Sequence, residues 1–145
     1  MNAGASHATS IVIAADAPRV FAFMADSAML PRWSFGTWEI ERLDGGIVRG
    51  KSLFDGSHIL VRIEADDRTL GVDYHLGQTV EQLAPRIAVR VVPGPVVGLG
   101  EDACVLTFLA WRAAAMTDDR WRRLTASHEL EVVLIKNLFE SGQIT

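Results

Sequence analysis

The stretch TDDRWRRLTASHELEVVLIKNLFESG, residues 117–142, decides the fold. It contains no proline and no glycine before its end. Asp118 and Asp119 follow Thr117 as at a helix start, where one side chain caps free amides and negative charge opposes the helix dipole. Gly142 is typical of a helix end. At about 1.5 Å per residue, the predicted helix is roughly 35 Å long, which is enough to cross a small domain.

One face of this predicted helix is apolar, because residues at helical spacing form a stripe. The stripe consists of Trp121, Leu124, Thr125, His128, Val132, Ile135 and Phe139. His128 at its centre is either a neutral, hydrogen-bonded core histidine or a polar contact inside a cavity. A zinc role is disfavoured, because Val132 stands where the H-E-x-x-H pattern requires a second histidine.

A second apolar strip lies on another side of the helix and consists of Leu130, Val133 and Leu134. It indicates either packing beneath a loop or a contact between two copies of the chain. Both interpretations stay open, and a homodimer is among them.

Size and composition exclude several classes of protein. A length of 145 residues predicts one domain, residues 1–145. The net charge of −4, without basic clusters, argues against nucleic acid as a partner. A single cysteine excludes an internal disulfide. We find neither a secretion signal nor an apolar run that could span a membrane, so we expect a cytoplasmic protein without a membrane partner.

The chain before this helix is rich in β-branched and alternating residues. Strands are predicted at residues 8–15, 37–43, 47–55, 58–65, 70–78, 86–92 and 104–112. Two short helices follow the first strand. Asp16 caps one of them, with Pro18 in its first turn, and Pro31 ends or bends the other, at residues 28–30.

This order predicts an α+β fold. The turns between strands are short, so neighbouring strands should pair antiparallel. The middle strands alternate apolar and polar residues, so one face of the sheet is covered. We therefore expect a curved sheet of about seven strands wrapped around the C-terminal helix, with two short helices after the first strand and a void near one end.

The opening IVIAADAPRVFAFMADSAMLPRWS, residues 11–34, resembles the START/polyketide cyclase superfamily, which includes the birch-pollen-allergen proteins. The similar features are a strand, a capped helix with proline and a Val-Phe pair, a break, and Leu-Pro-x-Trp. The resemblance implies the helix-grip fold and a ligand cavity between the sheet and the closing helix. It carries over no catalytic residue.

Six residues are candidate ligand contacts, chosen by their predicted inward direction: Trp38, Tyr74, Trp111, Thr125, His128 and Val132. In the last strand both faces are apolar, and we assign Val105, Thr107, Leu109 and Trp111 to the inner one. The phenol of Tyr74 needs a partner, which is either a ligand oxygen or a backbone carbonyl. Gly94, Gly98 and Gly100 lack the lysine of a phosphate loop, so we predict neither a nucleotide nor another cofactor, and no metal.

Three functions remain open. The first is binding of a small apolar or aromatic molecule, lipid- or polyketide-like, in a cavity above about 300 Å³. The second is a cyclase- or dehydratase-type lyase in the same cavity, with His128 as general acid/base and Tyr74 orienting a carbonyl. The third is a protein-interaction module that uses Leu130, Val133 and Leu134.

Overall fold

The computed structural model describes residues 4–144, so residues 1–3 and 145 of the expected domain lie outside the described part. Helices and strands follow in this order: β1 (Ser6–Ile13), α1 (Ala17–Ala25), α2 (Leu30–Trp33), β2 (Glu39–Arg42), β3 (Ile47–Lys51), β4 (His58–Asp66), β5 (Gly71–Gly77), β6 (Ala84–Pro93), β7 (Cys104–Trp111) and α3 (Asp118–Glu140). Short 3₁₀ turns occupy Ser27–Met29, Phe35–Thr37, Asp44–Gly46, Val80–Gln82 and Gly94–Val97.

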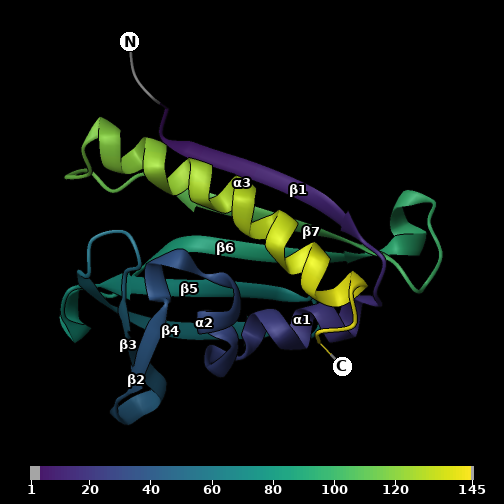
Figure 1. Ribbon diagram of the computed structural model, residues 1–145, viewed down its shortest axis with the longest axis horizontal. Coiled ribbons are helices and arrows are strands. Elements are labelled where there is room, and N and C mark those ends of the chain that lie inside the picture. The colour runs from purple at the N-terminus through teal and green to yellow at the C-terminus, as the bar shows by residue number, and fades with distance from the viewer. Residues whose placement is uncertain (1–3, 145) are drawn as a thin grey trace.

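The seven strands form one antiparallel sheet in the order β1-β7-β6-β5-β4-β3-β2. The first strand therefore pairs with the last, with Ser6 opposite Trp111 and Ile13 opposite Cys104. In Figure 1, α3 runs across one face of this sheet beside β1, and α1 and α2 lie on the same face further along. The predicted α+β architecture is confirmed.

α3 has both ends where the sequence places them. The cap differs in detail, because Thr117 itself accepts a hydrogen bond from the Arg120 amide, while Asp118 and Asp119 occupy the first turn. The helix ends before Gly142, whose φ is 79°. Such a positive φ favours glycine over residues that carry a Cβ.

Two short helices follow β1, as predicted. Asp16 caps α1 as predicted, and Phe23 of α1 packs edge-on against Phe139 of α3, with ring centroids 5.3 Å apart. The prediction for Pro31 is wrong. Pro31 stands in the first turn of α2, where no amide hydrogen bond is required, and the helix continues to Trp33.

The inner face of β7 is the reverse of the predicted one. Cys104, Leu106, Phe108 and Ala110 are buried, and Trp111 is 42% exposed. Paired residues on neighbouring strands share a face, and the inward Val89 and Val91 of β6 lie opposite Phe108 and Leu106. Because both faces of β7 are apolar, alternation within the strand could not identify its inner face. The register with β6 does identify it.

Trp38 is also not inward, and 44% of its surface is exposed. The chain forms the 3₁₀ turn Phe35–Thr37 before β2, and Trp38 itself has helical backbone angles. Because the strand begins only at Glu39, alternation counted from Thr37 gives the wrong face for Trp38.

Candidate functional site

A pocket of about 220 Å³ lies between the N-terminal half of α3 and strands β4 to β6. Its apolar wall includes Leu30, Trp33, Ile59, Val61, Leu76 and Ile87. Towards the C-terminal end of α3, the side chains Val132, Ile135 and Phe139 belong to the packed core instead. The void therefore lies near one end of the molecule, as the sequence predicts.

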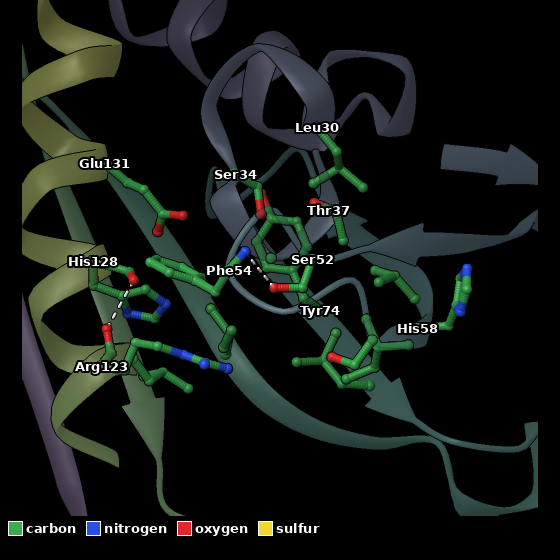
Figure 2. A pocket seen from close by; sticks show the side chains of 18 of the residues that line it. Leu30, Ser34, Thr37, Ser52, Phe54, His58, Tyr74, Arg123, His128 and Glu131 are labelled. Atoms are coloured by element: carbon green, nitrogen blue, oxygen red, sulfur yellow. Dashed lines mark hydrogen bonds between the residues drawn. The ribbon is translucent and has the colours of Figure 1, made fainter. Parts of the chain in front are cut away.

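The pocket and the core contact different faces of α3. The pocket is lined by Arg123, Leu124, Ser127, His128 and Glu131, whereas the core contains Val132, Ile135 and Phe139. His128 stands where the two faces meet. Figure 2 shows His128 and Glu131 directed from the helix into the pocket.

His128 is buried and neutral. Burial lowers its pKa from 6.5 to about 4, and nearby His7 adds to the shift. Its ring stands edge-on to Phe108, with centroids 5.2 Å apart, and its Nδ1 has no hydrogen-bond partner among the described residues. Of the two interpretations from the sequence, a satisfied core histidine does not fit this unpartnered nitrogen.

Glu131 is the pocket residue that sequence reasoning missed. It is 3% exposed, and burial raises its pKa from 4.5 to about 8, although a hydrogen bond from the Phe35 amide (2.9 Å) to its carboxylate opposes the shift. Spacing could have identified it, because Leu124, His128, Glu131 and Ile135 recur at helical intervals. A carboxylate in that series is a signal for a site.

Tyr74 lines the pocket, but its hydroxyl is occupied. It donates to the carbonyl oxygen of Met24 at 2.5 Å, near the end of α1. Burial raises the pKa of Tyr74 well above its usual value, and Glu131 adds to the shift. Of the two predicted partners, the structure therefore has the backbone carbonyl. Next to Tyr74, the register of β5 with β6 shifts at His75, and Ile87 lies opposite Tyr74 on the pocket side.

The other sequence candidates are not brought together with these residues. Val132 lies in the core, and the Thr125 hydroxyl donates to the Arg122 carbonyl along the helix. Neither residue lines the pocket, and the exposed Trp38 and Trp111 do not line it either. Of the six candidates, Tyr74 and His128 contact the pocket.

The loop between β3 and β4 borders the pocket on its solvent side, since Phe54 lines the pocket and is 48% exposed, and we call this side the mouth. Arg123 of α3 lies over the Phe54 ring, with its guanidinium carbon 4.8 Å from the centroid, and pairs with Asp55 at 3.3 Å. The Ser57 hydroxyl and amide, followed by Arg123, hold the pKa of Asp55 well below its usual range. The loop is therefore attached to the helix by two contacts, both of them through Arg123.

The second apolar strip of α3 differs from the prediction. Leu130 and Val133 are exposed, whereas Leu134 packs against the core, so the predicted second strip is narrower than three residues. Contact with a second copy there stays a prediction. Within residues 4–144, no three side chains of His, Cys, Asp or Glu come together to hold a metal ion. Among the same residues, no helix is long and apolar enough to cross a membrane.

Comparison with solved structures concerns the whole architecture. The ZhuI aromatase/cyclase from Streptomyces sp. R1128 is 22% identical, with 91% of this chain and 88% of that one covered and a TM-score of 0.60. The di-domain ARO/CYC BexL from the BE-7585A biosynthetic pathway is 20% identical, with a TM-score of 0.70; the alignment covers 93% of this chain and 46% of BexL. A START superfamily protein from Mycobacterium smegmatis is 14% identical, with 97% of each chain covered and a TM-score of 0.57.

The chain has the helix-grip fold of the START/polyketide cyclase superfamily. No family model matches the sequence, and a search of curated proteins gives no significant match. The helix-grip fold implied by the resemblance of residues 11–34 is thus confirmed. Proteins with a shared fold have many functions, so the function has to be argued from the pocket itself.

Proposed function

We propose that this protein binds a small apolar or aromatic molecule in the pocket between α3 and the sheet. The observation that carries the proposal is the pocket itself, whose surface is mainly apolar although about half of the residues that line it are polar. Binding sites for small molecules have this composition. Solved structures with this fold include aromatase/cyclases, which supports a ligand of this chemical class.

The volume limits the size of the ligand. The pocket of about 220 Å³ is smaller than the roughly 300 Å³ that the sequence-based hypothesis required for binding any small apolar or aromatic molecule, so that expectation is not met. An apolar cavity of about 150 Å³ is known to bind benzene. The enclosed space therefore suits a molecule of one or two rings, and a longer ligand would extend past Phe54 at the mouth.

The test is a titration with naphthalene in which quenching of tryptophan fluorescence reports binding, since Trp33 lines the pocket. Ile87→Trp adds a large side chain to the pocket wall and should weaken binding about tenfold or more. Arg90→Trp is the matched control, because Arg90 is exposed on the same strand. Equal affinity of Ile87→Trp and wild type would contradict the proposal.

A cyclase- or dehydratase-type reaction in the same pocket is the second candidate, because the buried, titratable side chains of His128 and Glu131 are among those that line it. The roles differ from those expected. The Tyr74 hydroxyl already donates to Met24, and Glu131, with a pKa of about 8, suits a general acid at neutral pH better than His128 does.

Incubation with an aryl β-hydroxy ketone separates the two functions. A lyase would release water and form the unsaturated ketone, and Glu131→Gln would abolish this reaction while binding persists. Recovery of unchanged ketone with wild-type protein supports binding alone.

A further inference from the structure

Three residues that line the pocket each carry a buried polar atom without a hydrogen-bond partner in the described part of the protein. Among the described residues, four buried side-chain atoms lack a hydrogen bond: Trp33 Nε1, Thr37 Oγ1, His128 Nδ1 and His7 Nδ1. The first three belong to residues that line the pocket. Each such atom costs about 1–3 kcal/mol when it stays unpaired. Their concentration around one cavity indicates that a ligand supplies the missing partners.

Glu131 adds a fourth polar group to this end of the pocket. Figure 2 shows its carboxyl group directed into the space beside His128. One oxygen accepts from the Phe35 amide at 2.9 Å, and no cation from the described residues offsets the burial of the group. A carboxyl group in this setting holds its proton at neutral pH and has an O–H to donate.

The hydrogen-bonding capacity of these groups defines the complementary atom. The Trp33 indole N–H and the protonated Glu131 are donors, while the Thr37 hydroxyl and neutral His128 can donate or accept. A ligand atom with lone pairs and no hydrogen, such as a carbonyl oxygen, satisfies several of them at once.

The charges around the pocket exclude an ionic ligand group at this end. The cations that line the pocket are Arg120, which is exposed to solvent, and Arg123, which is paired with Asp55 at the mouth. An anion next to Glu131 would therefore be buried without a counter-ion, which is unfavourable. An ammonium group would require Glu131 to ionise, and it would leave the Trp33 N–H unpaired.

We propose that His128 and Glu131, one helical turn apart on α3, form a polar subsite that selects a neutral carbonyl oxygen on a ligand of one or two aromatic rings, with the Glu131 carboxyl group as a donor. The subsite rests on the proposed function, because it occupies the buried end of the same pocket. It extends that function, because it specifies the chemical class of the ligand in addition to the size and shape of the ligand.

The experiment compares four probes of similar size by calorimetry at neutral pH: acetylnaphthalene, isopropenylnaphthalene, naphthoate and naphthylmethylammonium. The ketone and the alkene have nearly the same shape and differ in the carbonyl oxygen. We expect wild type to bind the ketone about tenfold more tightly than the alkene, because hydrogen bonds to the subsite replace unpaired donors.

Two variants assign the effect to Glu131. Glu131→Leu should reduce the ketone preference about threefold or more while alkene binding persists, and Glu131→Gln, which keeps an N–H donor, should retain most of it. Glu129→Leu is the matched control, since Glu129 is exposed on the same helix. Unfolding curves for each variant verify that it folds.

Each outcome bears on the proposal. Equal binding of ketone and alkene, or an unchanged preference in Glu131→Leu, overturns the carbonyl subsite while leaving the pocket as a binding site. Tightest binding of naphthylmethylammonium, lost in Glu131→Gln, would make Glu131 a counter-ion and also overturn it. If no probe binds wild-type protein, the proposed function itself fails, and the subsite fails with it.

Discussion

His128 and Glu131 lie one helical turn apart on α3, and burial changes their pKa values in opposite directions. The pKa of His128 falls from 6.5 to about 4, and that of Glu131 rises from 4.5 to about 8. Folded Glu131 holds its proton more tightly than the unfolded chain does. Its contribution to stability is therefore fully present below pH 4.5 and is lost as the pH rises through about 8. The contribution of His128 is present above pH 6.5 and is lost as the pH falls through about 4.

The free energy of unfolding should consequently fall between pH 6.5 and 8. In this range the stabilising contribution of Glu131 decreases with pH, whereas that of His128 is constant. The slope is at most about 1.4 kcal/mol per pH unit. Glu131→Gln, which cannot ionise, should remove most of it. Urea unfolding of both proteins at several pH values measures the effect, and identical slopes would contradict the assignment of pKa.

At the scale of single residues, the sequence predicted only some of the residues that line the pocket. His128 was found because a histidine is conspicuous within an apolar stripe. Glu131 was missed because the pocket face of α3 is rotated from the core face, and periodicity alone describes one apolar face at a time. Trp111 was misplaced because β7 is apolar on both faces, and register is decided by the neighbouring strand.

Among the elements, β3 and the turn before β2 approach each other at Gly50. A Cβ at this position would lie 2.9 Å from Thr37 Cβ and 3.2 Å from Thr37 Cα, so the backbone of the turn would have to move. Thr37 lines the pocket, and this contact therefore holds one of its walls in place.

Gly50→Ala should destabilise the protein by about 1–3 kcal/mol through overpacking. Gly36→Ala is a matched control in the adjoining turn, because a Cβ there meets no atom within 4 Å. It should change stability by less than about 0.5 kcal/mol. Urea unfolding compares the two, and a similar loss in both would contradict the role of the close contact at Gly50.

The loop between β3 and β4 is attached to α3 through Arg123, over Phe54 and beside Asp55. Arg123→Gln removes a cation–π contact and an exposed ion pair, so the mouth should open more often. Association and dissociation rates of naphthalene should both rise about fivefold, while the equilibrium affinity changes little.

Stopped-flow fluorescence measures these rates. Arg122→Gln is the control, because Arg122 pairs with Asp119 on the exposed side of the same helix. Rates in Arg123→Gln that match those of wild type would show that the loop does not limit entry.

The elements themselves were predictable, because alternation, turn residues and caps act locally. All seven strands were expected, and their ends differ by a few residues. One error was at β2, where the 3₁₀ turn Phe35–Thr37 replaces the expected start of the strand. That turn is stabilised by contacts from distant segments, such as the hydrogen bond from the Trp38 amide to Lys51, which local patterns do not contain.

For the molecule as a whole, occupancy of the pocket should be measurable as stability. A ligand that binds only the folded state at a hundred times its Kd contributes about 2.7 kcal/mol. For a chain of this length, acetylnaphthalene should raise Tm by roughly 6–10 °C. Calorimetric melting of wild type and Ile87→Trp is the comparison, and an equal shift in both would place the ligand outside the pocket.

The helix-grip fold was predictable at this scale because the order of elements admits few arrangements. The dimensions of the cavity were not predictable, since a volume of about 220 Å³ depends on how more than a dozen side chains from distant segments meet. The chemical class of the ligand was not predictable either, because it depends on which polar atoms remain unpaired after folding.

The pairing of β1 with β7 has a consequence for biosynthesis. Ser6 of β1 pairs with Trp111 of β7, so β1 leaves the ribosome long before β7 has been synthesised. At about 5–20 residues per second, that delay is roughly 5–20 s. During this time the nascent sheet lacks one side, and α3, which packs against β1, has not yet been translated. The pocket is therefore complete only after α3 has been synthesised, and a ligand cannot be held between α3 and the sheet before then.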